Sequence, residues 1–355
     1  MKTRNIFVFF ILSFFILAAN VCSAEYLEVY YLNVGQGDST LIISGEHSML
    51  IDGGNPEQSQ VVFTVLKQAG LSKLDYIIAT HADTDHVGGL SAALSAANGN
   101  VGTVFVPYTS CGDKSRFSSF IENTQKYGVA LAIPEEGKTY KLGDAEFQII
   151  SDGTGDCQTN KSIALKLTNG NNSFMFTGDT ETDDEAIILS QNYNLRSDVL
   201  KAGHHGSRSS TSGPFLNAVT PAITVISCGK NNDYGHPHQE VLYRLQNSGS
   251  KILRTDEEGH IAIVSDGTNL YIYTQNSKAF VDNISSSTVQ ERLESILEYA
   301  KNNQITYVLN TKSKKFHYIS CNSVTSISPK NRLDVDLSRE EVINMGYSPC
   351  GNCRP

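Results

Sequence analysis

The sequence lacks an excess of positive charge and has no hydrophobic run long enough to cross a membrane. Its 355 residues include 28 lysines and arginines against 37 aspartates and glutamates, a formal net charge of -9. This balance excludes a chain coated in positive charge for holding polyanions, although it leaves room for a local basic patch. Apart from one apolar run at the N-terminus, no run approaches the roughly 20 residues of a spanning helix, so the chain is not expected to form a membrane channel by itself.

The one pronounced apolar run lies at the N-terminus. It covers residues 6–19, follows a short basic start, and precedes small residues at 21–24. This is the layout of a secretory signal peptide, with cleavage predicted after Ala24. The alternatives are an uncleaved membrane anchor and a lipid attached to Cys22. A signal peptide predicts a secreted, extracellular protein, in which cysteine pairs can form disulfides.

Short β-rich runs alternate with helical stretches over most of the chain. Residues 26–34, 40–44 and 49–51 read as strands separated by glycine-containing turns. Residues 88–97 read as a helix, and residues 259–273 as a hairpin with Asp-Gly at its turn. Strands and helices mixed in this way predict sheets covered by helices, an α/β (α+β) fold.

Residue types that bind metals recur at the predicted strand ends. His81, Asp83, Asp85 and His86 fall within six residues, directly after a short buried strand. Further candidates follow later strands, at Asp179, His204, His205, His236 and His238. Imidazole nitrogens and carboxylate oxygens bind zinc, manganese or iron, and a carboxylate can bridge two such metals. A single such residue is more often solvated or caps a turn, but the repeated clusters predict a metal site.

These motifs resemble the metallo-β-lactamase superfamily, whose second motif reads His-x-His-x-Asp-His. The chain has Asp83 where the middle histidine of that motif stands. With Asp83 in that place, the motif resembles that of the soluble domain of ComEC-type DNA-uptake proteins. Four further motifs resemble the same branch: residues 33–39, 177–179, 201–207 and 235–242. The resemblance covers about residues 26–275 and implies an αββα metallo-β-lactamase sandwich with a hydrolytic two-metal site.

The resemblance also implies metal ligands. His81 and Asp83 would bind one divalent metal, Asp85 and His86 would bind the other, and Asp179 would bridge the two metals. One of the two adjacent histidines after residue 203 would complete the second site.

Further roles follow from the same motifs. Of His204 and His205, the second is favoured as the metal ligand. Catalytic roles are expected for Asp85, His236 and His204. His236 would bind substrate or shuttle a proton, and His236 or His204 would be the acid that protonates the leaving group. Substrate contacts are expected at Asp38 near the site mouth, at His238 and at Lys201.

One usual ligand of the superfamily has no counterpart in the sequence. No histidine occurs from Val87 to Gly203, where a further metal-binding histidine is usual. Asp156, Asn160 or Ser162 could substitute, or the metal could be bound more loosely. An oxygen-rich site leans from zinc towards manganese, so the two divalent metals are expected to be Mn²⁺ or Zn²⁺.

A second metal site is predicted near the C-terminus. His317 and Cys321 are separated by three residues, and Cys350 and Cys353 by two. Four such ligands can form a tetrahedral structural Zn²⁺ site. The alternatives are a Cys350–Cys353 disulfide or bridges with other cysteines. The surrounding sequence resembles the metal-binding domain of the Ada DNA-repair protein, which implies a small segment held together by zinc.

Three cysteines lie outside this group once the signal peptide is removed. Cys111 and Cys157 could form a disulfide. Cys228 is expected to be a buried thiol.

The C-terminal segment differs in charge from the rest of the chain. From residue 301 on, eight lysines and arginines face four aspartates and glutamates, about +4, so the preceding residues carry about -13. Its basic residues could contact phosphates, and its aromatic residues Tyr307, Phe316, Tyr318 and Tyr347 could stack bases. The alternative is a solvated basic face over an aromatic core. DNA and an anionic cell-wall polymer are the expected partners.

The sequence thus predicts four parts: a signal peptide at 1–24, a hydrolase domain at 25–276, a helical linker at 277–303 and a zinc-binding module at 304–355. The favoured function is a secreted metal-dependent phosphodiesterase, a ComEC-like nuclease that hydrolyses DNA with a metal-activated hydroxide. One alternative is a hydrolase of another ester: a phosphocholine or teichoic-acid esterase, a cyclic-nucleotide phosphodiesterase or a lactonase. The other is a non-catalytic DNA-binding or wall-binding protein.

Overall fold

A computed structural model describes the chain at residues 25–276, 284–302, 307–319, 321–335, 337, 339–353 and 355. The predicted signal peptide, residues 1–24, lies outside the described residues. None of the helices within the described ranges combines the length and the apolarity of a membrane span.

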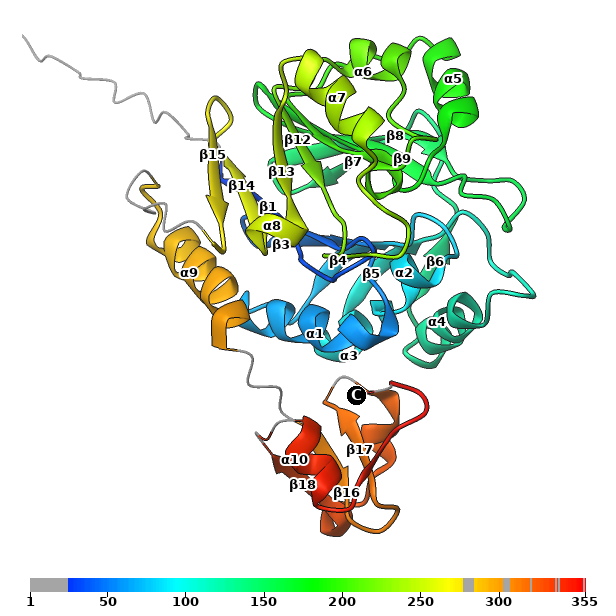
Figure 1. The fold of residues 1–355 in the computed structure, drawn as a ribbon, viewed down its shortest axis with the longest axis vertical. Coiled ribbons are helices and arrows are strands. Elements are labelled where there is room, and N and C mark those ends of the chain that lie inside the picture. Colours follow the sequence, from blue (N-terminus) through cyan, green and yellow to red (C-terminus); the bar gives the residue numbers. More distant parts are fainter. Residues whose placement is uncertain are drawn as a thin grey trace, which may run out of the picture.

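Two sheets stack face to face in the larger part of the molecule (Figure 1). The first sheet has eight strands in the order β15-β14-β1-β2-β3-β4-β5-β6. Its strands are β1 Leu27–Tyr31, β2 Thr40–Ser44, β3 His47–Ile51, β4 Leu74–Ile78, β5 Val101–Phe105, β6 Ala130–Ala132, β14 Ile261–Ser265 and β15 Leu270–Thr274. The second sheet has seven strands in the order β13-β12-β11-β10-β9-β8-β7. Its strands are β7 Thr139–Leu142, β8 Ala145–Asp152, β9 Ile163–Asn169, β10 Asn172–Phe176, β11 Val199–Lys201, β12 Ile223–Ile226 and β13 Lys251–Arg254.

Alternating side chains give each sheet two apolar faces. In β1, Val29 and Tyr31 join the core between the two sheets, whereas Tyr30 joins the core on the helix-covered side. Successive side chains of a strand point to opposite faces, so a continuous apolar strand can be buried on both sides. Phe147 and Phe174 of the second sheet meet Val29 and Tyr31 in the same inter-sheet core.

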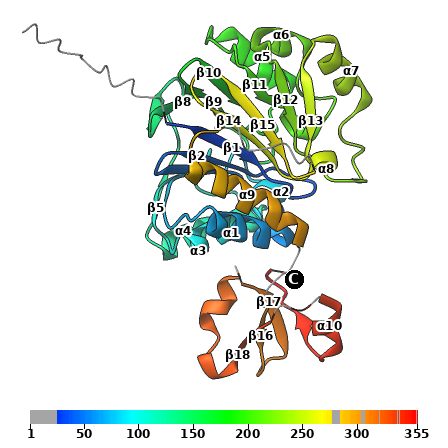
Figure 2. The ribbon, with the colours of Figure 1, turned by 90° about the vertical axis from the view of Figure 1, so that its left-hand side faces the viewer.

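Helices cover both outer faces, as Figure 2 shows from the side. The helices on the first sheet are α1 Ser59–Gln68, α3 Leu90–Ala96, α4 Ser115–Lys126 and α9 Ser287–Asn302. Those on the second sheet are α5 Thr182–Ser190, α6 Gly213–Val219 and α7 Gln239–Asn247. Short helices complete the chain: η1 Pro56–Gln58, α2 Thr84–Val87, η2 Gly203–Gly206 and α8 Thr255–Glu258. The predicted αββα sandwich is therefore confirmed.

Helix α9, in the predicted linker, packs against the sandwich. Val289, Leu293 and Ile296 are buried in the core beneath the first sheet. Arg292 lies 3.4 Å from the carboxylate of Glu28 on β1, which is 1% exposed. Burial raises the pKa of Glu28 to about 7, and the guanidinium opposes that rise. The apolar face and this ion pair fix the helix to the sandwich.

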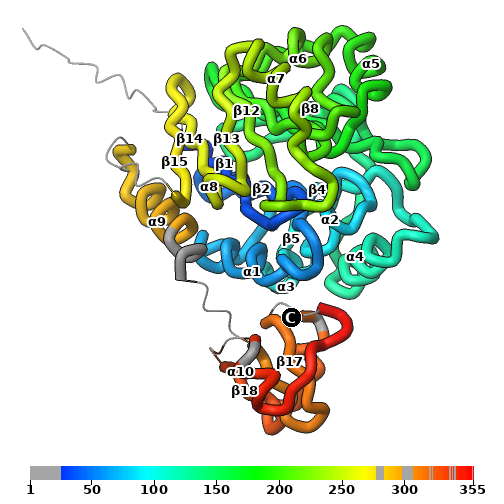
Figure 3. The backbone as a smooth tube through the Cα atoms, viewed as in Figure 1, coloured from blue at the N-terminus to red at the C-terminus, as the bar shows by residue number. Residues whose placement is uncertain are grey.

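A small sheet with its own core follows α9 (Figure 3). It has four strands in the order β18-β16-β17-β19. Its elements are β16 Tyr307–Asn310, β17 Lys315–Tyr318, η4 Asn322–Ser326, η5 Pro329–Asn331, β18 Arg332–Val335, α10 Arg339–Asn344 and β19 Ser348–Pro349. The aromatic residues proposed as base-stacking groups, Tyr307, Phe316, Tyr318 and Tyr347, are at most 9% exposed and form its core. Of the two alternatives, the aromatic core is therefore the one that the structure supports, because a segment this small needs its aromatic residues for burial.

Candidate metal centre

The ligand-type residues meet where strands of both sheets end. Asp52 follows β3, His81 follows shortly after β4, and Asp179 follows shortly after β10. Strands β3 and β4 are parallel, and so are β10 and β11. Parallel strands present their carboxyl ends, where ligands commonly bind, at one edge of a sheet. The strand ends of the two stacked sheets thereby build a single centre.

Four imidazoles surround the carboxylate of Asp179, which is 3% exposed. Its Oδ2 atom lies 3.2 Å from Nε2 of His86 and 3.4 Å from Nε2 of His205. The same oxygen lies 3.6 Å from Nε2 of His204 and 4.0 Å from Nε2 of His81. A carboxylate in the middle of several imidazoles is suited to bridge two cations.

The remaining ligand candidates divide into two groups around Asp179. Asp85 Oδ2 lies 3.1 Å from Nε2 of His205 and 3.9 Å from Nε2 of His86. On the other side, Asp83 Oδ2 lies 3.9 Å from Nε2 of His81. This division is the one expected of two metal positions that share one bridging carboxylate.

Buried atoms without a hydrogen bond test whether these residues fit a metal. Among the described residues, such atoms include Nε2 of His81, Nε2 of His86 and Oδ1 of Asp179. Leaving buried polar atoms unsatisfied costs about 1–3 kcal/mol each. The two Nε2 atoms face the carboxylate of Asp179, and carboxylate and imidazole are ligands that Zn²⁺ and Mn²⁺ accept. The residues therefore fit divalent metals.

The charges of the centre also suit cations. Burial would raise the pKa of Asp179, but the imidazoles of His205 and His86 hold it well below its usual range. Burial likewise opposes ionisation of Asp85, yet His86 and His205 lower the pKa of Asp85. Both carboxylates are therefore anions and available as ligands.

Asp52 orients one of these imidazoles and was not singled out from the sequence. Nδ1 of His86 donates to Asp52 Oδ2 at 2.8 Å. Thr80 holds the same carboxylate through its backbone N–H, at 2.9 Å, and its hydroxyl, at 2.7 Å. With the proton fixed on Nδ1, Nε2 of His86 presents a lone pair to the centre. The only sequence signal was an acid directly after a buried strand.

Replacing Asp52 by asparagine should lower the affinity for Mn²⁺ or Zn²⁺ about 10- to 100-fold. An amide NH₂ in the place of Oδ2 would donate to His86 Nδ1 and move the imidazole proton to Nε2. Metal titration with calorimetry measures the change. Asp75→Asn is the matched control, since Asp75 accepts from Ser48 and Lys73 away from the centre. Equal affinities of the two variants would refute the role.

Two consecutive histidines adopt the left-handed conformation. The φ and ψ angles are 47° and 48° at His204, and 53° and 24° at His205. This conformation costs roughly 1–2 kcal/mol per non-glycine residue, and such strain concentrates at functional sites. Nδ1 of His205 donates to the carbonyl of Ser227 at 3.0 Å, which leaves Nε2 free to face Asp179. His205 is 2% exposed, whereas the side chain of His204 is 22% exposed. Of the two, His205 belongs to the group of candidate ligands whose atoms lie within 4.8 Å of one another.

Asp38 was expected near the site mouth and Lys201 in contact with substrate, but both side chains are buried. The two residues form a buried ion pair and are 5% and 3% exposed. Asp38 Oδ1 also lies 3.2 Å from Nδ1 of His205. Because each charge neutralises the other, the pair can remain beneath the centre. One ligand atom of each of Asp38, His86, Asp179 and His205 lies within 4.8 Å of the others, so Asp38 is itself a candidate metal ligand.

His236 lies against the centre, and His238 lies one ring further out. The His236 ring centroid is 5.6 Å from that of His204 and 6.2 Å from that of His205. Burial, with His205 and His204 beside it, lowers the pKa of His236 to about 4. His238 is 4.9 Å from His236, and its Nδ1 accepts the backbone N–H of Arg208 at 3.1 Å.

Of the three proposed substitutes for the missing histidine, Ser162 touches the centre. Its hydroxyl lies 3.3 Å from Nδ1 of His81 and accepts the backbone N–H of Asp179 at 3.0 Å. Since it contacts Nδ1 rather than Nε2, Ser162 orients His81. Asn160 instead donates to Glu181 at 3.3 Å, and Asp156 caps a turn at Gln158 at 3.0 Å.

A lysine pairs with the residue that departs from the superfamily motif. Lys114 Nζ lies 2.5 Å from Oδ1 of Asp83. The nearby Cys111 forms a disulfide with Cys157, as the sequence allowed. This bond ties the loop before α4 to the loop before Ser162, both of which border the centre. Cys228 is a buried free thiol, as expected.

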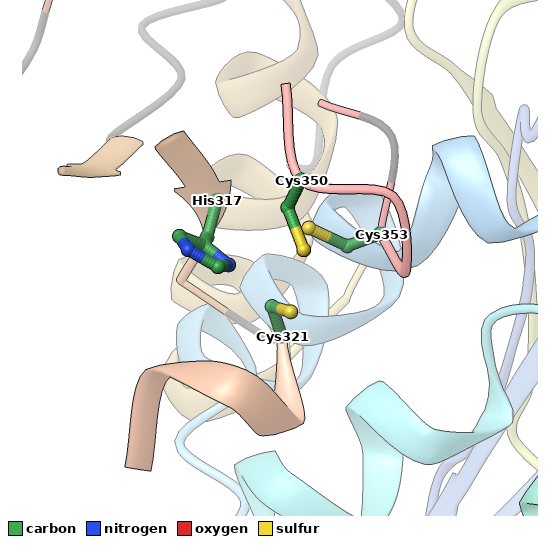
Figure 4. Close-up of side chains that lie close together, drawn as sticks. All are labelled: His317, Cys321, Cys350 and Cys353. Atoms are coloured by element: carbon green, nitrogen blue, oxygen red, sulfur yellow. The ribbon is translucent and has the colours of Figure 1, made fainter. Parts of the chain in front are cut away.

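The C-terminal ligand group converges on one point (Figure 4). The ligand atoms of His317, Cys321, Cys350 and Cys353 lie within 4.8 Å of one another. The three thiols are free, so neither the Cys350–Cys353 bridge nor another disulfide forms among them. Both ring nitrogens of His317 are buried without a hydrogen-bond partner among the described residues. Three thiols and one imidazole fit a tetrahedral zinc ion.

Comparison with known proteins places this geometry in a family. Residues 32–230 match the family described as the metallo-beta-lactamase superfamily. The chain is 32% identical to ComE operon protein 3 of Bacillus subtilis over 268 residues, which cover 70% of this chain and 34% of that protein. It is 32% identical to competence protein ComA of Neisseria gonorrhoeae over 229 residues, which cover 64% and 30%.

The chain thus spans about a third of the length of these curated relatives. Among solved structures, the metallo-beta-lactamase fold protein YhfI of Bacillus subtilis matches with a TM-score of 0.44 and 15% identity, over 70% of this chain and 100% of that one. Because the family match covers more than half of the residues, the chain belongs to the metallo-β-lactamase superfamily, as a hydrolase that resembles the ComEC-type competence proteins.

Proposed function

We propose that this protein is an extracellular metal-dependent phosphodiesterase that hydrolyses DNA. The observation that carries the proposal is the carboxylate of Asp179, with the Nε2 atoms of four histidines within 3.2–4.0 Å. The ligand sets on either side of it suit two metals, a common arrangement in phosphodiester hydrolysis. The names of the competence relatives support DNA as the substrate.

The residues divide the work as follows. His81 and Asp83 would hold one metal. Asp85, His86 and His205 would hold the other metal, and Asp179 would lie between the two. Two divalent metals would supply Lewis acidity to the phosphoryl oxygens and a reactive water.

Proton transfer to the leaving oxygen is assigned to a histidine at the edge of the centre. His204 reaches Asp179 with Nε2, and its partial exposure lets it meet both substrate and solvent. Oε1 of Glu181 lies 3.4 Å from Nδ1 of His204 without a hydrogen bond between them. His236 was the other candidate, and its ring borders both His204 and His205. Its pKa of about 4 leaves the imidazole neutral near pH 7, so it is suited to accept a proton rather than to donate one.

Two further features support this setting. The Cys111–Cys157 disulfide is typical of an oxidising compartment and agrees with the predicted signal peptide. We also assign a structural Zn²⁺ to His317, Cys321, Cys350 and Cys353. The basic C-terminal segment would add a phosphate-binding surface.

A substrate panel tests the proposal. Wild-type protein loaded with Mn²⁺ or Zn²⁺ in parallel is expected to degrade DNA in preference to a phosphocholine ester, a cyclic nucleotide and a lactone. Asp85→Ala should lose this activity, because Asp85 faces both His86 and His205. Metal-loaded wild type that is inert on single- and double-stranded DNA would overturn the nuclease assignment.

A further inference from the structure

An exposed aromatic ring stands beside the metal centre. Tyr234 is 68% exposed, the highest value among the large apolar side chains of the described residues. It lies in the loop between β12 and α7, the segment that also carries His236. A single exposed aromatic side chain is common on protein surfaces. The surroundings of Tyr234, however, suggest a reason for its exposure.

The loop that carries Tyr234 is held in shape by one asparagine. Oδ1 of Asn232 accepts the backbone N–H groups of Tyr234, at 3.2 Å, and of His236, at 2.9 Å. Its Nδ2 donates to the carbonyls of Gly229, at 2.9 Å, and His236, at 2.6 Å. Gly229 in turn donates to the side chain of Gln36 at 3.1 Å. The exposed ring is therefore presented from a fixed backbone.

Tyr234 is the outermost member of a row of rings that begins at the centre. The centroids of His205 and His236 are 6.2 Å apart. Those of His236 and Tyr234 are 5.7 Å apart, with the planes inclined by 24°, so the two rings stack. One face of Tyr234 is thus occupied by His236, and the high exposure leaves area for a second flat group. Base–aromatic stacking uses such a face.

A polar hollow of about 530 Å³ adjoins the ring row and reaches His236. Lys230 and Asn231 line it and are exposed. No carboxylate within the described part of the chain pairs with Lys230. The nearby acids Asp256 and Glu257 are already paired with Arg254, at 2.7 and 2.8 Å. The hollow therefore offers one free cation and an amide to a sugar-phosphate backbone.

We propose that Tyr234 is the stacking platform for an unpaired base of single-stranded DNA, with Lys230 beside its phosphate. This inference rests on the proposed function and deepens it, because it names the form of the substrate. A base in a duplex is stacked and paired within its own helix, so it cannot lie flat on a protein ring without being extruded. The row of rings would place the stacked nucleotide next to the phosphate at the centre.

Binding to an uncleaved strand tests the platform independently of catalysis. In an Asp85→Ala background, fluorescence anisotropy compares a single-stranded oligonucleotide with an abasic strand of equal length. Adding Tyr234→Ala should weaken binding of the base-bearing strand roughly tenfold, leave the abasic strand unchanged, and make the two strands bind alike. Tyr234→Phe should retain the preference. Tyr243→Ala is the matched control, since Tyr243 on α7 is 64% exposed.

Three outcomes are distinguishable. Equal affinity of Tyr234→Ala and Tyr243→Ala for the base-bearing strand would overturn the platform, even if wild type cleaves DNA. If the wild type cleaves no DNA, but Tyr234→Ala still abolishes the preference for the base-bearing strand, the proposed function would be overturned and the platform would stand. Weaker binding of the abasic strand by Tyr234→Ala would mean that the loop is disturbed rather than a stacking surface lost, and would also refute the inference.

Discussion

Asp179→Asn is expected to lower the rate of phosphodiester hydrolysis about 100- to 1000-fold, the scale on which a single electrostatic stabiliser acts. The amide is neutral and a poor bridging ligand, so the imidazoles on both sides would lose their shared anion. Neither metal position would keep its full ligand set. Steady-state kinetics with Mn²⁺-loaded protein, together with metal content per chain, measure both consequences.

The fold should survive this change, because the turn around Asp179 is held by its backbone. The N–H of Asp179 donates to Ser162 at 3.0 Å, and the N–H of Thr180 donates to the carbonyl of Thr177 at 3.1 Å. Asp198→Asn is the matched control, since Asp198 accepts from Ser173 away from the centre. A variant Asp179→Asn with a tenth or more of the wild-type rate would contradict a bridging role.

The layer order was implied by the resemblance to the metallo-β-lactamase superfamily, and the pattern of short β-rich runs between turns was enough to predict the central strands. It failed at β6, β7 and β13, which the sequence pattern did not indicate. All three are edge strands, three or four residues long and partly exposed. An edge strand pairs on one side only and packs less, so its sequence carries little of the buried pattern that marks an inner strand.

The types of the ligand residues were readable from the sequence, but the residues that support them were not. Asp52 reaches His86 across 34 positions, and Lys114 reaches Asp83 across 31. Such contacts depend on how loops of different strands meet, which no local pattern records.

Charge and aromatic patterns misled for the same reason. A lysine and an aspartate in motifs near a site suggest substrate contact, yet Lys201 and Asp38 neutralise each other in the interior. The C-terminal aromatic residues suggested a base-binding surface and instead fill a core. Tyr234 is the most exposed of the large apolar side chains in the described residues, and no motif in the sequence pointed to it. Burial separates these cases, and burial is a property of the folded chain.

The second large effect is expected at the C-terminal ligand group, where Cys353→Ser should unfold the segment after residue 306 and leave the sandwich folded. Structural zinc contributes about 10–16 kcal/mol to folding in small domains, whereas whole domains are stable by about 5–15 kcal/mol. The core of this segment consists of a single small cluster around Phe316 and Val308. Without the metal it cannot offset the entropy of ordering its chain.

Limited proteolysis and zinc content test this expectation. Cys353→Ser should lose one zinc per chain and be cleaved rapidly within the C-terminal segment. Cys228→Ser, at a buried thiol 3.2 Å from Asp256 in the sandwich, should keep both properties. One contact of the segment with the sandwich is the Arg116 guanidinium, which donates to the carbonyl of Asn352 at 3.1 Å, and the segment supplies none of the candidate ligands around Asp179. Hydrolysis of a small phosphodiester should therefore persist in Cys353→Ser. A variant that keeps its zinc and resists protease would show that the four side chains form no structural metal site.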